Sequence, residues 1–589
     1  MYYSIMKSFS KTYLAVSVFY FTLTCILTYP LILNLNSGIY GFKGDNMLYI
    51  HDIWAWGDGK GLDFGEIKPS QITTQPLLDY TAVIISKVTS PLTAYNLLII
   101  LSFVLSGLFT YLFIYKLTKS VPSALIAGSI FTFSSYHLRQ AQVHLEISQI
   151  WVIPFYSYFF YNFITLPNKA NTIKAGLSLG ASTLIVNYYG FFLGLITGLS
   201  LLCEITKKVI KKQKKVVSYL LLVIGMFFIT SMVVVIPNIN SIKLLMEKGG
   251  IKELSWKAQG RNEEDYIKHS AKPWFYLLPD IDNPIFGKVS RNTLLFISKF
   301  KPFYLTRSYT SNESTLYIGL VTTIFAIYGA VKVKKVRIII PLIIALFLFS
   351  LPPYLTKSET KIPLFSYPLY KLFPIFRVYS RWGIIILFTT LIPASFGIKK
   401  ILNKLNSKKF KPYRVVLITL IILLSIGEHY SKVKFTNLLD PVPQHYEIVK
   451  NHRARMLTEG PKLEDFTTIF YQTYHEKPVW FTRITSQIEI DKNDLASNLN
   501  KVDKTPLFLF NSNYEDVFFK HKNNERGIDL HEINFLKTNP SISNLESLRK
   551  TPTDLNERKK WILKNIDIIT SISGLKKIYT DGEVFLFEK

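Results

Sequence analysis

Cysteine is almost absent from this sequence. Cys25 and Cys203 are the only two among 589 residues, and both fall within apolar runs. No disulfide framework or thiolate metal site can therefore form in an exposed region. The sequence also has no GxxxxGK[ST] loop, no strand–GxGxxG–helix unit, no HExxH box, no long repeat and no low-complexity linker. These absences argue against disulfide-stapled, repeat-based and nucleotide-dependent proteins.

Acidic residues are few relative to basic ones. The chain has 69 Lys and Arg against 40 Asp and Glu, a formal charge of +29. The basic residues are concentrated in tracts between apolar runs, at 206–215, 331–337 and 399–414. Such tracts are typical of cytoplasmic loops that face anionic lipid. This distribution favours a membrane partner and argues against a nucleic acid.

Long apolar runs dominate what is present. A stretch of roughly 20 apolar residues can cross a bilayer, and the pattern predicts a polytopic α-helical membrane protein with about eleven transmembrane helices. The first run follows Lys7 and Lys11 and is predicted to be a retained anchor rather than a cleaved signal. The predicted spans are 11–34, 92–115, 122–135, 147–166, 174–187, 190–204, 216–237, 314–331, 338–352, 382–398 and 414–430.

The Lys-rich tracts predict the orientation of these spans. With a cytoplasmic N-terminus, the alternation places 116–121, 167–173, 205–215, 332–337 and 399–413 inside, where nearly all the Lys-rich tracts then lie. This result requires 174–204 to be two short helices, broken at NYYG (187–190), because a single helix would invert every later segment. The C-terminal segment is then extracytoplasmic.

Two domains are predicted. Residues 1–430 form the transmembrane domain, with outer loops 35–91 and 238–313, and residues 431–589 form a small extracytoplasmic α/β domain. In this second domain the patterns predict strands at 466–475, 567–572 and 583–589 and a helix at 554–565.

The first outer loop carries an unusual segment, GDNMLYIHDIWAWGDG (44–59). Its tryptophans suit the membrane–water boundary, and a carboxylate held there could act as a general base. Asp45 is the first candidate and Asp52 the second, whereas Asp58 is the least favoured because glycines flank it. The ordinary alternative for each is a solvated loop carboxylate.

Three further polar clusters lie at predicted outer ends of spans. His137 and His144 occur in YHLRQAQVHLE (136–146), Glu313 opens SNESTLYIGL (311–320), and Arg377 and Arg381 lie four residues apart before a late span. Arginines on the outer face run against the positive-inside tendency, so an anionic ligand would explain them. The alternatives are an interfacial loop for the histidines, a helix N-terminus for Glu313, and lipid head-group contact for the arginines.

These motifs together resemble the GT-C superfamily of integral-membrane glycosyltransferases, the bacterial enzymes similar to polyprenyl-phosphate-sugar-dependent and protein O-mannosyltransferase enzymes. The motifs that carry the resemblance are GDNMLYIHDIWAW, HLEISQIWVIP (144–154), ESTLYIG (313–319), FPIFRVYSR (373–381) and the tail stretch YQTYHEKPVWFTRITSQ (471–487).

The resemblance implies transfer of a sugar from a polyprenyl-phosphate-linked donor to a cell-envelope glycan, lipid or protein acceptor on the extracytoplasmic face. It assigns the catalytic base to Asp45 and places Arg377 and Arg381 at the donor phosphate, with His144 and Glu313 near the same cavity. Many members carry an acidic pair where this chain has Asp45 followed by Asn46. No cofactor is assigned with certainty, and use of a divalent cation is therefore left open.

Two other classes compete with the enzyme. A transporter of lipid-linked glycans would place ionisable residues at mid-membrane, whereas the predicted spans are almost free of charge. A non-catalytic cell-envelope assembly protein would use the domain at 431–589 to bind a partner.

Overall fold

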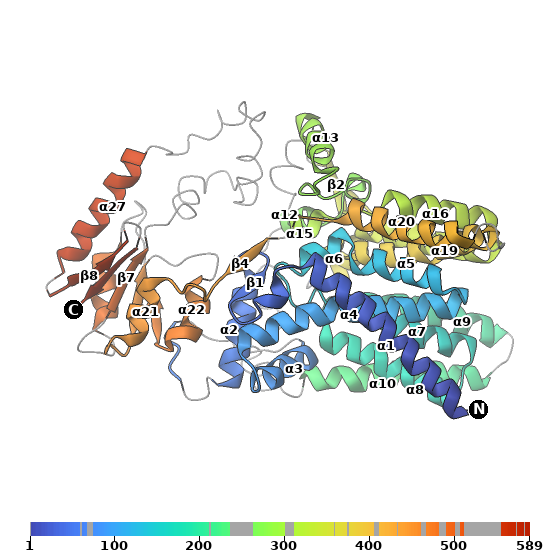
Figure 1. Cartoon of the computed structure of the whole chain (residues 1–589). Helices are drawn as coiled ribbons and strands as arrows, with labels where there is room; N and C mark the ends of the chain where they lie inside the picture. Colours follow the sequence, from blue (N-terminus) through green and yellow to red (C-terminus); the bar gives the residue numbers. More distant parts are fainter. Residues whose placement is uncertain are drawn as a thin grey trace. The chain divides into compact units, whose positions relative to one another are not determined.

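The computed structural model is largely helical, with one small mixed sheet (Figure 1). The chain groups into two compact units. The first unit contains Met1–Leu33, Gln71–Ala82 and Asn96–Lys434, and the second contains Asn34–Ser70, Val83–Tyr95 and Phe435–Lys589.

The structure describes most, but not all, of the chain. The predicted outer loop 238–313 lies outside the described residues over 238–262 and 301–310, as do residues 482–487 of the tail motif. The described residues are 2–58, 62–66, 75–210, 214–235, 263–300, 311–357, 360–373, 376–405, 411–432, 434–460, 467–481, 490–500, 507–511, 555–572, 574–581 and 584–589.

Each predicted span coincides with a helix. Two segments, Pro91–Thr118 and Tyr379–Lys404, are long and apolar enough to cross a membrane by length and composition. The number of crossings remains a prediction. The helices that match the spans are α1 (Tyr2–Leu27), α4 (Pro91–Thr118), α5 (Val121–Thr132), α7 (Val152–Thr165), α8 (Lys169–Ile185), α9 (Asn187–Ile210), α10 (Lys214–Val235), α16 (Leu320–Lys332), α17 (Ile340–Ser350), α19 (Trp382–Lys404) and α20 (Lys411–His429).

Shorter elements connect these helices. The elements are η1 (Leu31–Leu33), α3 (Pro76–Ser86), α6 (Ser135–Gln140), α12 (Glu263–Lys268), η3 (Pro273–Tyr276), α13 (Gly287–Phe300), α15 (Ser311–Ser314), η4 (Lys334–Ile339), β2 (Tyr354–Lys357), β3 (Thr360–Pro363), α18 (Tyr367–Leu372) and η5 (Tyr379–Arg381).

The prediction of two helices within 174–204 is confirmed. Asn168 caps α8, its side chain accepting a hydrogen bond from the backbone N–H of Asn171. The helix ends at Val186, which is extended, and α9 starts at the next residue. The break comes directly before NYYG, so the polar Asn187 opens the second helix.

Hydrogen bonds from side chains join the ends of different helices in the first unit. At one end Lys399 Nζ of α19 donates to the Thr118 carbonyl of α4 (2.6 Å). At the other, Ser135 Oγ donates to the His429 carbonyl at the end of α20 (2.8 Å). The alternation predicted from charge requires this grouping, because it places 116–121 with 399–413 on one side and 136–146 with 431 onward on the other.

Helices α16 and α19 form the most extensive helix pair in the described part of the first unit. Two glycines face each other across this pair. A Cβ at Gly329 would lie 1.9 Å from the Pro393 carbonyl oxygen, and one at Gly397 would lie 2.2 Å from that of Phe325. The small residues therefore let the two backbones approach closely, as is common between membrane helices.

The second unit is built on a five-stranded sheet of order β6-β5-β7-β9-β8. Strand β5 (Leu457–Gly460) runs parallel to β6 (Val479–Phe481) and β7 (Leu507–Asn511), whereas β9 (Val584–Glu588) is antiparallel to β7 and to β8 (Lys576–Thr580). The other elements of this unit are α2 (Asp45–Gly57), α21 (Gln444–Asn451), α22 (Thr467–His475), α23 (Lys492–Leu499), α27 (Leu555–Thr570) and the antiparallel pair β1 (Gly38–Tyr40) and β4 (Phe435–Asn437).

Two strand predictions in this unit are wrong. The predicted strand at 466–475 is helix α22, whose residues are buried on nearly all sides, and contacts with α2 and α21 override the strand preference of its aromatic and β-branched residues. The predicted strand at 567–572 is largely the last turn of α27. There Ile562, Ile566 and Ile569 recur at helical spacing and pack on the sheet core. The helix at 554–565 and the strand at 583–589 are confirmed as α27 and β9.

The glycine contact between α16 and α19 makes a stability prediction. Gly329→Ala and Gly397→Ala should each lower the free energy of unfolding by roughly 1–3 kcal/mol, because the added methyl group meets backbone that cannot rotate away. Gly225→Ala on α10 is the matched control, since its Cβ would meet no atom within 4 Å. Denaturant unfolding of the detergent-solubilised chain measures all three, and equal midpoints would contradict the close approach.

Candidate functional site

A buried ion pair lies at the start of α19. Arg381 donates from Nε and Nη2 to Oε1 of Glu313 (3.0 and 2.6 Å), and Ser380 Oγ lies 3.3 Å from Oε2 of the same carboxylate. Both charged side chains are buried, Glu313 at 6% and Arg381 at 8% exposure. Glu313 comes from the short helix α15 and Arg381 from the residue before α19, so the pair joins two segments nearly seventy residues apart.

The charge of Glu313 is maintained by this partner. Burial raises the pKa of the Glu313 carboxyl, but the charge and hydrogen bonds of Arg381, with smaller contributions from His144 and His269, lower it to about 2. The carboxylate is therefore ionised at neutral pH and matched to the guanidinium.

An aromatic wall completes the surroundings of Arg381. Its guanidinium lies 4.4 Å from the ring centroid of Tyr188, a cation–π contact from the start of α9. The neighbouring Tyr189 exchanges a hydrogen bond with Tyr136 (3.1 Å) and donates to the Ile147 carbonyl (2.7 Å). The NYYG segment, read from sequence only as a helix break, therefore supplies side chains to this cluster.

His144 joins the cluster through α6. Its Nδ1 lies 2.7 Å from Oε1 of Gln140, whose amide donates to the Asn312 carbonyl directly before Glu313 (3.0 Å). His144 also contributes to the lowered pKa of Glu313. The structure thus brings His144 and Glu313 into one neighbourhood, together with Arg381.

His269 is a member of the cluster that the sequence patterns do not single out. Its carbonyl accepts a hydrogen bond from the Ser380 N–H (3.0 Å), and its buried Nδ1 has no hydrogen-bond partner among the described residues. Burial lowers the pKa of the imidazole, and the nearby charge of Arg377 lowers it further, to about 3. His269 is therefore neutral at physiological pH and lies within electrostatic range of Arg377 and Arg381.

A buried lysine, Lys272, holds the turn that carries His269. Nζ of Lys272 donates to the carbonyls of Ile267 and of Ser270 (2.8 Å for the latter), at the end of α12. Cations at a helix C-terminus satisfy its last carbonyls. No sequence motif surrounds His269, so its place in the cluster is seen only in the folded structure.

A second acid–arginine cluster adjoins the first. Arg139 of α6 is bidentate on Asp280 (both 2.5 Å) and also reaches Asp282 (2.5 Å). Thr315, two residues after Glu313, has its Oγ1 3.3 Å from Asp280. Burial raises the pKa of Asp280, but Arg139 outweighs it and keeps the pKa below the usual value. This cluster holds α6, the 280 loop and the Glu313 segment together.

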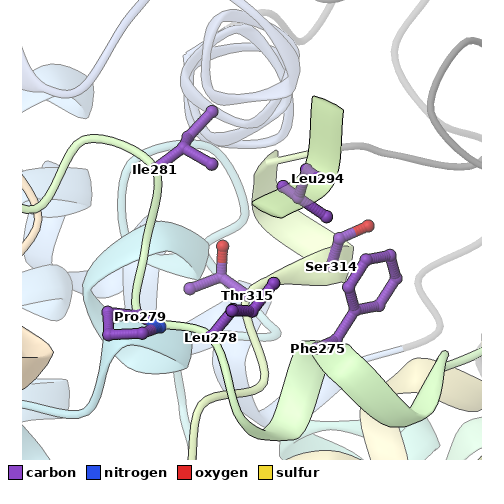
Figure 2. A pocket seen from close by; sticks show the side chains of 7 residues that line it. All are labelled: Phe275, Leu278, Pro279, Ile281, Leu294, Ser314 and Thr315. Carbon is purple, nitrogen blue, oxygen red and sulfur yellow. The ribbon is translucent and has the colours of Figure 1, made fainter. Parts of the chain in front are cut away.

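A small pocket opens beside these residues (Figure 2). Ser314 and Thr315, directly after Glu313, contribute its two hydroxyl groups, and five apolar side chains surround them. The apolar lining consists of Phe275, Leu278, Pro279, Ile281 and Leu294.

The side chain of His137 is held by hydrogen bonds to other protein groups. Its Nδ1 lies 2.7 Å from the Thr132 carbonyl and its Nε2 3.1 Å from Ser102 Oγ, while the ring stacks on Phe103. Both ring nitrogens are engaged with the protein. His137 is therefore not included in the function proposed below.

The predicted base lies in the second unit. Asp45 is half-buried in the first turn of α2, and Asp52 is buried two turns later on the same helix face. Asn46 fixes the turn before the helix, because its side chain accepts from the Gly44 N–H (3.0 Å) and donates to the Phe42 carbonyl (2.8 Å). The residue after Asp45 is thus an amide with a structural role.

Helix α2 is attached to the tail of the chain by its opposite face. His51 is fully buried, with Nε2 3.0 Å from Oε1 of Gln472 on α22. Trp54 packs edge-on against Phe64 (5.6 Å). Two of the sequence motifs, the Trp-rich loop and YQTYH, therefore form one structural element.

The described residues do not fit a divalent cation. Among them, no group of three or more His, Cys, Asp or Glu side chains could hold a metal ion. Asp45 and Asp52 are seven residues apart, about 10 Å along a helix axis, too far to chelate one ion together.

The buried pair predicts the pH dependence of stability. Glu313→Gln should cost roughly 3–5 kcal/mol, because it leaves a buried guanidinium without its anion. The folded-state pKa of Glu313 is depressed from 4.5 to about 2, so its contribution is full above pH 4.5 and is lost as the pH falls toward 2.

Denaturant unfolding across this pH range measures the effect. The variant should lose part of the acid slope that the natural chain shows. Asp58→Asn is the matched control, because the Lys87–Asp58 pair is about half exposed and should contribute less than about 1 kcal/mol. An unchanged slope in Glu313→Gln would contradict the assigned role.

Comparisons with known proteins give three findings. The family model described as a domain of unknown function, DUF6311, matches residues 70–256, and no curated protein matches the sequence. Among solved structures, the chain is similar to ArnT from Cupriavidus metallidurans bound to undecaprenyl phosphate (TM-score 0.46, 10% identity, 99% of this chain and 98% of that one).

A second similar structure is the oligosaccharyltransferase of Archaeoglobus fulgidus (TM-score 0.45, 12% identity, 86% of this chain and 70% of that one). Both neighbours are GT-C glycosyltransferases, the superfamily that the sequence motifs resemble. At these identities and TM-scores, an activity for this chain has to rest on its own residues.

Proposed function

We propose that this chain is a membrane glycosyltransferase of the GT-C type. It transfers a sugar from a polyprenyl-phosphate-linked donor to a cell-envelope acceptor on the extracytoplasmic face. The observation that carries the proposal is the cluster at the start of α19, where Arg377 and Arg381 are gathered with Glu313, His144 and His269.

The charge of this cluster suits a phosphate. A buried ion pair is costly to desolvate and is often no more stable than an apolar pair, so its presence calls for a further reason. The two arginines and one carboxylate leave net positive charge beside a neutral imidazole. Guanidinium groups match phosphate oxygens in shape and charge, and neutral His269 can add a hydrogen bond.

The proposed reaction assigns one role to Asp45 and another to the two arginines. The hydroxyl oxygen of the acceptor attacks the anomeric carbon of the donor sugar, and the Asp45 carboxylate takes the hydroxyl proton. The bond between that carbon and the phosphate oxygen breaks, and the electron pair leaves with the lipid phosphate. Arg377 and Arg381 stabilise the charge that develops on this phosphate.

The location of these groups agrees with a lipid-linked donor. Arg381 immediately precedes α19 and lies within the apolar segment Tyr379–Lys404. A phosphate at this level keeps its polyprenyl chain in the bilayer while the sugar faces the extracytoplasmic side, under the orientation predicted from the lysine tracts. Nucleotide sugars would be unavailable on that side.

The proposed base makes the first activity prediction. Asp45→Asn should lower transfer by at least about a hundredfold, because an amide cannot take the proton. Asp58→Asn, thirteen residues away in the exposed Lys87 pair, is the matched control and should retain activity. The assay is sugar transfer by the full chain in vesicles with an undecaprenyl-phosphate sugar, the lipid present in the ArnT structure. Full activity of Asp45→Asn would rule out Asp45 as the base.

Arg377 makes the second activity prediction. Arg377→Gln should raise the KM for the donor on the order of tenfold to a hundredfold, since one charge-assisted hydrogen bond contributes about 1.5–3 kcal/mol. Lys371→Gln removes an exposed cation from the same segment and should leave the KM unchanged. An equal change in both variants would show that only the general charge of the segment matters.

A further inference from the structure

The first turn of helix α9 carries two neighbouring tyrosines that point in different directions. Tyr189 is fully buried, and its hydroxyl bonds to the hydroxyl of Tyr136 and to the Ile147 carbonyl (3.1 and 2.7 Å). Tyr188 is only half-buried, and its ring lies 4.4 Å from the guanidinium of Arg381. Successive residues of a helix are about 100° apart around its axis, so the anchored Tyr189 fixes the direction in which Tyr188 points.

Aromatic contacts join the start of α9 to the segment that carries both arginines. Phe376 directly precedes Arg377, and its ring stacks flat on Phe191 of α9, with ring centroids 4.0 Å apart and 4° between the planes. The ring of Tyr188 meets Phe376 edge-on (5.2 Å, 87°). Tyr188 thus contacts both Phe376 and the guanidinium of Arg381, and these two contacts fix the position of its ring.

Two hydrogen-bond donors at this contact have no partner within the described part of the chain. Arg381 donates to Glu313 from Nε and Nη2, whereas its Nη1 makes no hydrogen bond to a described residue. The hydroxyl of Tyr188 makes none to a described residue either. Neither atom is fully buried. A ligand that reaches the guanidinium can therefore accept hydrogen bonds from both groups.

The ligand that these donors fit is an anion with several oxygen acceptors. Nη1 of Arg381 offers charged N–H groups, and the phenol of Tyr188 offers one neutral O–H group. Hydrogen bonds to a phosphate oxygen are charge-assisted and are stronger than those between neutral groups. The ring acts separately from the hydroxyl, because a cation–π contact holds the guanidinium against its face.

We propose that Tyr188 is a further donor-binding residue. Its hydroxyl donates to the lipid phosphate, and its ring keeps the Nη1 side of Arg381 turned toward the same phosphate. The assignment rests on the proposed function, because that function brings a polyprenyl phosphate to Arg381. The segment NYYG (187–190) then has two roles, since it starts α9 and also supplies a substrate contact.

Two substitutions separate the hydroxyl from the ring. Tyr188→Phe removes the hydroxyl and keeps the ring beside Arg381, whereas Tyr188→Leu removes both. Tyr115→Phe is the matched control, because Tyr115 is also half-buried and its hydroxyl makes no hydrogen bond to a described residue. Its ring also faces a cation, Lys119, with Nζ 6.0 Å from the ring centroid. Tyr115 lies in the last turn of α4, away from the cluster.

Binding of undecaprenyl phosphate to the full chain in nanodiscs tests the proposal, and undecaprenol serves as the same lipid without a phosphate. The natural chain should bind the phosphate more tightly than the alcohol. Tyr188→Phe should weaken binding of the phosphate about tenfold, the loss expected for one hydrogen bond to a charged group, and leave binding of the alcohol unchanged. Tyr188→Leu should weaken it further, because the guanidinium loses the ring that holds it. Tyr115→Phe should match the natural chain.

Three results would overturn the proposal. Equal affinities of Tyr188→Phe and the natural chain for the phosphate would mean that the hydroxyl makes no contact with it. An equal loss of affinity for the phosphate and the alcohol would mean that Tyr188 contacts the lipid chain instead. A natural chain that binds both lipids equally would mean that no phosphate is held at Arg381.

Sugar transfer distinguishes a failure of this inference from a failure of the proposed function. A natural chain that binds undecaprenyl phosphate through Tyr188 but transfers no sugar would refute the proposed reaction and leave the assignment of Tyr188 intact. A natural chain that transfers sugar, with the same KM for the donor in Tyr188→Phe, would refute the assignment of Tyr188 alone.

Discussion

The buried pair of Glu313 and Arg381 is the interaction around which the first unit is organised. The two charges can be removed from water only if each has the other, and this requirement fixes the segments that carry them. Ser380, beside Arg381, donates to the His269 carbonyl, and Gln140 of α6 donates to Asn312, beside Glu313. One ion pair thereby gathers four separate stretches of chain. The Arg139–Asp280 pair repeats the same arrangement next to it and links α6 to the loop before α13.

Four of the residues that stand out in the sequence lie in this cluster, but the sequence does not predict their partners. Charged residues beside apolar runs are costly, so His144, Glu313, Arg377 and Arg381 stood out from composition and position alone. Arg377 and Arg381 are equivalent in the sequence, however, and only the fold makes Arg381 the partner of Glu313. His269 and Tyr188 gave no signal, because a lone loop histidine and a turn tyrosine are common. Their roles arise from contacts across more than a hundred residues.

The fold likewise contains elements that follow from the local sequence and elements that depend on contacts distant in sequence. Every apolar run became a helix, since a long hydrophobic segment has few alternatives. In the second unit, short segments depend on what buries them. The aromatic residues of 466–475 favour a strand locally, yet the His51–Gln472 contact and burial on nearly all sides make α22 a helix. Asn46 is a comparable case. In the sequence, an amide in place of a second acid beside Asp45 suggests a missing metal ligand. In the structure, the side-chain amide of Asn46 holds the turn before α2.

Under the proposed reaction, the presence of Glu313 has a chemical consequence. Two guanidinium groups that bound the donor phosphate in the ground state as tightly as in the transition state would lower KM without raising kcat. Glu313 already satisfies two donors of Arg381, so the ground-state phosphate gains less from that side chain. Arg377 and neutral His269 can then bind the phosphate while the hydrogen bond between Arg381 and Glu313 stays intact. As charge moves onto the leaving oxygen, the attraction between that oxygen and the guanidinium of Arg381 increases. An arginine that binds the ground-state phosphate weakly and the developing charge more strongly raises kcat rather than only lowering KM.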